Sequence, residues 1–239
     1  MPDLRALPGR ILRAMLPSAC ALCGAHADDA VCAACAQAYV LPVARCPCCA
    51  NPSARLDRGR HCGACLAQQP AFDATVAACD YAAPLDSVAL QLKFGAQLAL
   101  APWMAHVLRD AVVASGVALP DVLCPVPLGP ARLVERGYNQ ALEVARPLAR
   151  ALRVALAPRL LQRVRETQAQ SGAAPGARKK NVRGAFALDA AVDVRGRHVG
   201  VVDDVMSSGH TLDETAAILK RAGAARVTNL VFARTPPHA

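Results

Sequence analysis

Two adjacent aspartates, Asp203 and Asp204, end an apolar run that reads HVGVVDD. The loop SSGHT follows after two apolar residues, and a helix-like pattern begins at its end. In open α/β sheets, ligands bind at the edge where strands end and helices begin. Buried carboxylates without partners are costly, so this pair suits sugar hydroxyls, a Mg²⁺ shell or a developing positive charge. Because adjacent strand residues point to opposite faces, the two acids need not share one partner.

The loop after the acids has the composition of a phosphate cradle. Ser207, Ser208 and Thr211 supply hydroxyl donors, and Gly209 permits a tight turn with close approach of a ligand. Backbone N–H groups at the start of a helix attract phosphate. Acids and loop together fit a ribose 5-phosphate. The alternative is a capping box formed by Thr211 and Glu214, which explains those two residues but not the paired acids.

Four CxxC pairs lie in the first part of the chain and have the spacing of zinc knuckles. Two CxxC turns complete a tetrahedral Zn²⁺ site, so four turns predict two structural sites. The predicted ligands are Cys20, Cys23, Cys32, Cys35, Cys46, Cys49, Cys62 and Cys65. Sequential and interleaved pairing of the turns are both open, and Cys48 is a spare thiol. Closed four-cysteine sites leave no catalytic position, so we expect the chemistry further along the chain.

The composition narrows the class of protein. The chain has 239 residues, of which 54% are hydrophobic, enough for one sizeable domain and a small one. The formal charge of +9 suits an acidic partner such as a nucleotide; eight thiolates (−8) and two Zn²⁺ (+4) would lower it to +5. No apolar run approaches about 20 residues, so we expect no membrane insertion. With no recognisable secretion signal, we expect a cytoplasmic location and reduced cysteines rather than disulfides.

The elements that must position these residues alternate between strand and helix after Phe72, which is typical of an α/β fold. Strands are predicted at 72–82, 121–128, 198–204 and 226–233. Helices are predicted at 85–114, broken near Pro102, at 139–154, kinked or divided at Pro147, and at 211–223. A basic loop occupies 165–181. The predicted division is 1–70 for an N-terminal helix and double zinc ribbon, and 71–239 for a mostly parallel sheet flanked by helices.

The stretch VVDDVMSSGHT resembles the phosphoribosyl-pyrophosphate (PRPP) binding motif of type I phosphoribosyltransferases. That motif has an apolar strand, two acids, two apolar residues and Thr-Thr-Gly-x-Thr. Ser207 and Ser208 keep both hydroxyls, and His210 occupies the variable position, where small residues are common. The segments PVPLGPARLVERGYNQA, LQLKFGAQ and LQRVRETQAQSGAAPGARKKNVRGAF are similar to signatures of the ComF family. Its members are competence-associated or gluconate-locus-type phosphoribosyltransferase-like proteins with an N-terminal double zinc ribbon.

This resemblance covers nearly the whole chain and implies a type I phosphoribosyltransferase fold. It implies Mg²⁺-dependent transfer of a phosphoribosyl group from PRPP to an unnamed acceptor in nucleotide metabolism. Asp203 and Asp204 would be catalytic. The 5-phosphate would bind to Val205, Met206, Ser207, Ser208, Gly209, His210 and Thr211. Pyrophosphate would face 128–136 with Lys93, Arg136, Arg163, Arg165 and Arg178, and the acceptor would face Tyr138, Asn139 and Gln140.

These assignments have ordinary structural alternatives. Lys93 can extend from an amphipathic helix, and Asn139 can N-cap the helix that starts at Gln140. Tyr138 can cover the edge of the core, and the loop arginines can form a solvated charge run. Phe94 is expected in the core.

A second function is a binding module that holds PRPP or a nucleotide and handles single-stranded DNA, as the competence link of the family implies. Aromatic residues make up only 3% of the chain, which argues mildly against a stacking platform for single strands. A zinc-ribbon scaffold with an inactive transferase fold is the third alternative, and the intact acids and hydroxyl loop disfavour it.

Overall fold

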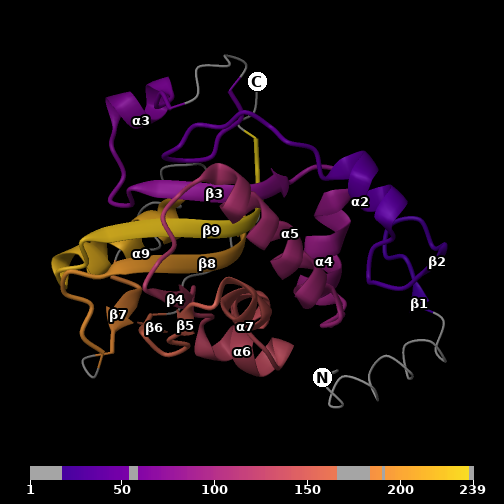
Figure 1. Ribbon diagram of the computed structural model, residues 1–239. Helices are drawn as coiled ribbons and strands as arrows, with labels where there is room; N and C mark the ends of the chain where they lie inside the picture. The colour runs from indigo at the N-terminus through magenta and orange to yellow at the C-terminus, as the bar shows by residue number, and fades with distance from the viewer. Residues whose placement is uncertain (1–17, 54–58, 166–183, 190–191, 237–239) are drawn as a thin grey trace, which may run out of the picture.

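A five-stranded, all-parallel sheet is the centre of the computed structural model, which describes residues 18–53, 59–165, 184–189 and 192–236 (Figure 1). The spatial order is β3–β9–β8–β4–β5. The strands are β3 (Ala74–Asp80), β4 (Val122–Pro125), β5 (Ala155–Leu156), β8 (His198–Met206) and β9 (Arg226–Arg234). Parallel strands end at one common edge. Because β8 is the central strand, its two acids lie at the middle of the carboxyl edge.

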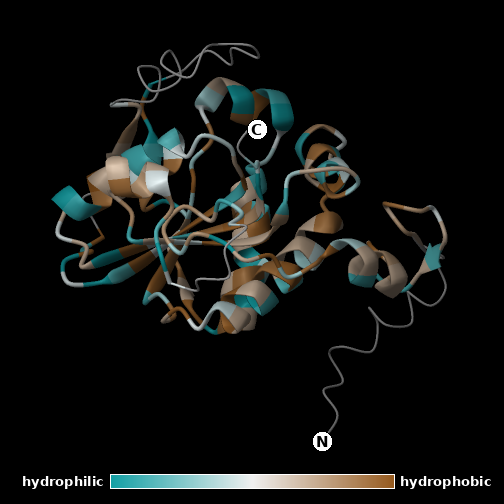
Figure 2. Cartoon of the chain, turned by 90° about the horizontal axis from the view of Figure 1, so that it is seen from above, coloured by the Kyte–Doolittle hydropathy of each residue, from teal (hydrophilic) through white to brown (hydrophobic). Residues whose placement is uncertain are grey.

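Helices and the cysteine-rich segment cover the two faces of this sheet. One face packs against α4 (Leu85–Phe94), α5 (Leu100–Ser115) and α7 (Gln140–Leu152). The other face packs against α9 (His210–Arg221) and the third and fourth cysteine turns. Val202 belongs to the first core and Val201 to the second, as the alternation of a strand requires. Figure 2 shows hydrophobic and hydrophilic residues alternating along the helices.

The predicted helix at 85–114 is two helices, and its break lies at 95–99 rather than at Pro102. Pro102 instead lies in the first turn of α5. Backbone N–H groups in a first turn have no acceptor within the helix, so the N–H that proline lacks costs no helical hydrogen bond. The helix at 139–154 is undivided, because α7 runs through Pro147. Val144 and Leu148 are fully buried on either side of that proline, so packing holds the helix across the lost hydrogen bond.

Smaller elements complete the fold. Strand β6 (Leu161–Arg163) precedes the basic loop and β7 (Phe186–Leu188) follows it, and the two pair as an antiparallel ribbon. Most of the loop (166–181) lies outside the described residues. The other short elements are β1 (Ser18–Ala19), β2 (His26–Ala27), α2 (Ala33–Tyr39), α3 (Gly63–Ala67) and α6 (Pro130–Arg136). Figures 1 and 2 place β1 and β2 at one end of the molecule and the β6–β7 ribbon at the other.

The cysteine-rich segment contributes buried side chains to both cores. Cys20 and Cys35 lie in the core with α5, and Cys46 and Cys65 lie in the core with α9. The division at residue 70 stays a prediction, and the N-terminal helix expected before Cys20 lies largely outside the described residues. Among the helices of the described ranges, none is long and apolar enough to cross a membrane.

Candidate functional site

The two acids lie inside β8, which continues two residues beyond its predicted end. Asp204 is 3% exposed, and within the described part of the chain its Oδ2 atom has no hydrogen-bond partner. Asp203 is partly exposed, and its Oδ1 accepts a hydrogen bond from the backbone N–H of Asp204 (3.0 Å). An unpaired buried acceptor costs on the order of 1–3 kcal/mol. The pair therefore presents an unsatisfied carboxylate oxygen at the carboxyl edge, which fits a cation or a sugar hydroxyl.

The charges around the acids act mainly against ionisation. Burial raises the pKa of Asp203 well above its usual value, and the Asp204 carboxylate raises it further. The Lys93 ammonium, near the end of α4, acts in the opposite direction. Burial also raises the pKa of Tyr81, with Asp86 and Asp204 adding to the shift. Lys93 and Tyr81 are thus close enough to the acids to interact with their charges.

The helix start after the acids is not a capping box. The N-cap position of α9 is Gly209, with φ 80°, and it offers no side chain. Thr211 lies within the first turn, and Glu214 Oε1 accepts a hydrogen bond from the backbone N–H of Gly184 (2.9 Å) instead of closing the cap. The capping alternative for Thr211 and Glu214 is therefore wrong.

The loop keeps its donors available for a ligand. Ser207 and Ser208 are exposed, and their hydroxyls form no hydrogen bond with other described residues. The first N–H groups of any helix lack partners within it. A Cβ on Gly209 would lie 2.6 Å from Met206 Cε, so only glycine fits this turn as it stands. Hydroxyl and N–H donors beside a pair of carboxylates suit a phosphorylated sugar.

Arg234 holds this loop and was not identified from the sequence. It ends β9 and is 6% exposed. Its Nη1 donates to the backbone carbonyls of Met206 (3.1 Å), Ser207 and Thr235 (2.6 Å), and its Nε donates to the carbonyl of Cys49 (2.9 Å). The only sequence signal was an arginine at the end of an apolar strand.

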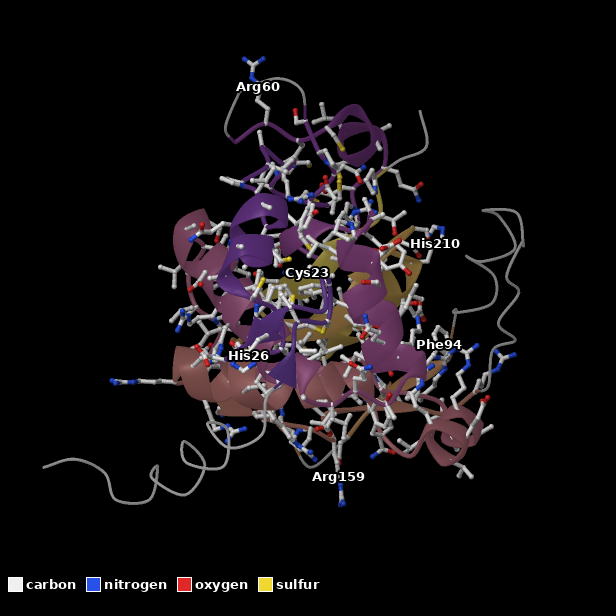
Figure 3. The ribbon with its side chains drawn as sticks, turned by 90° about the vertical axis from the view of Figure 1, so that its right-hand side faces the viewer. Cys23, His26, Arg60, Phe94, Arg159 and His210 are labelled. Carbon is white, nitrogen blue, oxygen red and sulfur yellow. The ribbon has the colours of Figure 1, made fainter. Side chains whose placement is uncertain are left out.

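Lys93 and Arg136, both predicted to face pyrophosphate, lie close to one exposed aromatic ring. Lys93 Nζ lies 5.9 Å and Arg136 Cζ 5.4 Å from the ring centroid of Phe94. Phe94 is 73% exposed, so its predicted place in the core is wrong: it is the last residue of α4, beyond the helix's buried face. Arg136 also donates to Gln140 Oε1 (2.5 Å). Figure 3 shows Phe94 and His210 on the same side of the molecule.

The three residues assigned to the acceptor side serve the fold. Asn139 N-caps α7: its Oδ1 accepts from the backbone N–H two residues on (3.0 Å), and its Nδ2 donates to the carbonyl after β4 (3.0 Å). Tyr138 donates its hydroxyl to a backbone carbonyl of α4 and packs on the core edge. Gln140 is 7% exposed and bonded to Arg136. Because these side chains are already hydrogen-bonded within the protein, the structure favours the structural alternatives: Asn139 as the cap of α7 and Tyr138 as a cover for the edge of the core.

The described arginines of the basic loop lie on and just after β6. Arg163 Cζ lies 5.4 Å from the ring centroid of Phe186 on β7. Arg163 Nε is 3.4 Å from the Arg165 carbonyl, and Arg165 is exposed. Arg178 lies outside the described residues.

The cysteine turns pair sequentially, which the sequence had left open. Each quartet has its four sulfur atoms within 4.8 Å of one another; the quartets are Cys20, Cys23, Cys32, Cys35 and Cys46, Cys49, Cys62, Cys65. Cys23 Sγ lies 3.8 Å from Cys32 Sγ, and Cys49 Sγ 3.5 Å from Cys62 Sγ. Thiolates about 2.3 Å from a tetrahedral Zn²⁺ lie about 3.8 Å apart, so both quartets fit zinc. Sulfur atoms gather near Cys23 in Figure 3.

Backbone N–H groups favour one thiolate in each quartet. Cys20 Sγ accepts from the N–H groups of Leu22 (3.4 Å) and Cys32 (3.3 Å), and Cys46 Sγ accepts from that of Cys62 (3.3 Å). Burial raises the pKa of Cys20 and Cys46, but the backbone hydrogen bonds outweigh it, giving values of about 6 and about 7. A bound metal cation further favours the thiolate forms.

Two further residues of the third cysteine turn, Cys48 and Ala50, are buried beside the ligands. Cys48 is 2% exposed and is not in either quartet, and burial raises its pKa to about 11, so it is a packing thiol. Ala50 takes φ 56°, a left-handed conformation that usually favours glycine.

Comparison with known families gives two matches. A model described as "Phosphoribosyl transferase domain" matches residues 139–237, and one described as "Double zinc ribbon domain" matches residues 11–66. Together with the parallel sheet, the first match confirms the predicted type I phosphoribosyltransferase fold class. Together with the two quartets, the second confirms two four-cysteine zinc sites.

Comparison with individual proteins extends over most of the chain. This chain is 35% identical over 227 residues to "DNA utilization protein YhgH" of Salmonella typhimurium, and the match covers 92% of this chain and 98% of that protein. It is 34% identical over 169 residues to "Competence protein F" of Haemophilus influenzae, covering 69% and 74%. A solved structure of glutamine PRPP amidotransferase from B. subtilis shares 20% identity, with a TM-score of 0.38, over 55% of this chain and 26% of that one.

Proposed function

This chain belongs to the ComF family, and on that premise we propose that it binds PRPP at the carboxyl edge of its sheet and transfers the phosphoribosyl group in a Mg²⁺-dependent reaction. The observation that carries the proposal is the buried Oδ2 of Asp204 beside Asp203, which has no hydrogen-bond partner among the described residues. A ligand that donates to this oxygen removes the cost of an unsatisfied buried acceptor.

The donor half of the substrate spans the acids and the loop after them. Ribose hydroxyls or Mg²⁺ would meet Asp203 and Asp204, and a bound cation would lower the raised pKa of Asp203. The 5-phosphate would accept hydrogen bonds from the loop Val205–Thr211. As the bond to pyrophosphate breaks, positive charge develops on the ribose, and two preorganised carboxylates stabilise it. The acids therefore act by binding and by electrostatics, without a covalent intermediate.

We assign the leaving group, pyrophosphate, to cations on other elements near the acids. Lys93 already interacts with the charge of Asp203, and Arg136 lies close by over Phe94. Arg165, at the base of the basic loop, is exposed and available. Arginine offers two parallel N–H donors to phosphate oxygens, which suits a pyrophosphate. Mg²⁺, when bound with PRPP, neutralises part of the same charge.

Calorimetric titration with PRPP tests the binding step. We expect binding that requires Mg²⁺ and is at least about 100-fold weaker when Asp203→Asn and Asp204→Asn are combined, since two charged contacts are lost. Asp110→Asn is the matched control, because this exposed aspartate lies on α5 and pairs with Arg109. Failure of the wild-type chain to bind PRPP, or wild-type affinity in the double variant, would contradict the proposal.

Pyrophosphate release with a panel of purine and pyrimidine bases tests the transfer step. Release that depends on one added base identifies the acceptor and confirms the enzyme. Tight PRPP binding without release across the panel would reject transfer to these acceptors and favour a binding module.

Contact with single-stranded DNA is the second candidate function. Relatives carry the names "DNA utilization protein" and "Competence protein F". The specific observation is Phe94, whose exposed ring has the cations of Lys93 and Arg136 within 6 Å of its centroid. A base can stack on an exposed ring while neighbouring cations meet the phosphates, which is how single strands are held without sequence preference. The low aromatic content argued against a stacking platform for single strands, but one exposed ring beside two cations is enough to stack one base.

Fluorescence anisotropy with a labelled oligonucleotide tests this candidate. We expect affinity to fall as salt rises, and Phe94→Ala to weaken binding about tenfold, because stacking contributes about 1–3 kcal/mol per base. Leu66→Ala is the control, since Leu66 has the same 73% exposure and lies on α3. Undetectable binding at low salt, or equal effects of the two substitutions, would reject the candidate.

A further inference from the structure

The third cysteine turn, residues 45–50, lies along β3, a strand at one edge of the sheet. Arg45 Nη1 forms an ion pair with Asp80 Oδ1 at the end of β3 (2.7 Å), and the Arg45 side chain is only 11% exposed. The carbonyl of Pro47 accepts a hydrogen bond from the backbone N–H of Thr75 (3.1 Å). The second zinc site is therefore fastened to β3, the edge strand that pairs with β9.

Arg234 connects this turn to the loop after the acids. One guanidinium donates to the carbonyl of Cys49, a ligand of the second zinc site, and to the carbonyls of Met206 and Ser207, where the loop begins. The side chain is 6% exposed, so little water is available to replace these bonds. A guanidinium is a rigid fork whose donors point in fixed directions, so it relates the positions of its acceptors to one another.

A second contact holds the other end of the same loop. The backbone N–H of Ala71, which follows the fourth cysteine turn, donates to Asp213 Oδ1 in the first turn of α9 (2.7 Å). Phe72, the next residue, is 4% exposed and belongs to the core that contains Cys46 and Cys65. The segment between Met206 and the first turn of α9 is thus fastened at both ends to residues in or just after the cysteine turns of the second zinc site.

The first zinc site has different neighbours. Cys20 and Cys35 pack in the core that contains α4 and α5, and Gln91 on α4 donates to the carbonyl of Ala21 (3.3 Å). Within the described residues, no hydrogen bond or ion pair joins this quartet to the loop at 206–211. The two zinc sites therefore differ in what they can influence.

We propose that Arg234 is a positioning residue, which fixes the loop at 206–211 relative to the second zinc site, so that zinc in this site sets the affinity of the loop for the phosphate of PRPP. This inference rests on the proposed function for its ligand. The mechanical link between zinc site and loop stands on the contacts alone and can be measured without PRPP.

Arg234→Lys is the decisive variant, because a single ammonium keeps the charge but cannot reach Cys49, Met206 and Ser207 together. The matched control is Arg226→Lys, at the opposite end of the same strand. The measurements are zinc content, amide hydrogen exchange of the peptide 206–211, and PRPP affinity by calorimetry. For Arg234→Lys we expect two zinc ions, faster exchange in 206–211 and about tenfold weaker PRPP binding, equal to about 1.4 kcal/mol. The control should match the wild type.

Two outcomes separate this proposal from the proposed function. If the wild-type chain does not bind PRPP, the exchange measurement still decides the link between zinc site and loop. A folded Arg234→Lys protein with two zinc ions, unchanged exchange and unchanged affinity overturns the proposal. If Arg234→Lys is insoluble, Asp80→Asn replaces it, because it loosens the same turn through Arg45; unchanged exchange at 206–211 in that variant overturns the proposal as well.

Zinc ligands give a second comparison. Cys23→Ser removes an exposed ligand of the first site and should lower the zinc content to one while exchange at 206–211 stays unchanged. Cys62→Ser removes a ligand of the second site and should speed exchange in that peptide. Equal effects of the two substitutions would show that zinc acts on the whole fold and would reject the specific link.

Discussion

Replacing Asp203 with asparagine should stabilise the free protein while it weakens PRPP binding. At neutral pH the folded chain holds two adjacent carboxyls in a mostly buried position, where Asp204 Oδ2 has no partner among the described residues. The substituted amide keeps an oxygen for the backbone N–H of Asp204, removes the like charge and adds an N–H donor within reach of the Asp204 carboxylate. Relieving one buried, unsatisfied acceptor is worth about 1–3 kcal/mol. For a chain of this size, each kcal/mol raises Tm by about 2–4 °C.

The gain should depend on pH in a defined direction. Because the folded-state pKa of Asp203 is raised above the ordinary value of about 3.9, the folded protein binds this proton more tightly than the unfolded chain does. The free energy of unfolding of the wild type therefore falls as pH rises from about 4 through the folded pKa. The advantage of Asp203→Asn should be fully present above the folded pKa and should disappear toward pH 4.

Urea unfolding at a series of pH values from 4 to 8 measures this difference, since the unfolding free energy is obtained by linear extrapolation. Asp110→Asn is the control, because its exposed carboxyl should give no comparable gain. A variant that is less stable than the wild type at pH 7, or whose advantage is the same at pH 4 and pH 8, would refute the reasoning about the acid pair.

Three further substitutions test other parts of the structure. Cys48→Ser should keep two zinc ions per chain by metal analysis, whereas Cys65→Ser should lose one and lower Tm; loss of zinc from Cys48→Ser would contradict the assigned quartet. Asn139→Ala should lower the free energy of unfolding by about 1 kcal/mol through loss of the α7 cap and leave PRPP affinity unchanged; weaker binding would return Asn139 to the site. Gly209→Ala should weaken PRPP binding, because a φ of 80° is strained for alanine and the loop relaxes by shifting; unchanged affinity in calorimetry would contradict that role.

Local pattern predicted the elements that carry the site. The unit at 198–234 was read within two residues of its observed strand and helix ends, because valine runs, a glycine turn and a helical period are properties of neighbouring residues. The break at 95–99 was placed too late, since proline is tolerated in a first helical turn. The left-handed Ala50 was not expected, because its neighbours hold a conformation that alanine alone disfavours.

Residues whose roles depend on distant partners were assigned less well. Phe94 was expected in the core, but it is the last residue of α4 and is exposed. Thr211 and Glu214 have the spacing of a capping box, yet Glu214 bonds to Gly184, thirty residues earlier. Spacing alone could not show these partners, since a side chain takes the strongest contact that the whole fold offers it.

The sequence by itself determined the fold class, the zinc ligands and the stretch that carries the paired acids, because each depends on residue types at short, regular spacing. Only the tertiary structure decided which cysteine turns share a metal, that Asp204 Oδ2 is buried with no partner in the described part of the chain, and that Arg234 joins Cys49 to the loop after β8. The physical reason is that pairing, burial and a hydrogen bond between residues 185 positions apart are set by the packing of the whole chain.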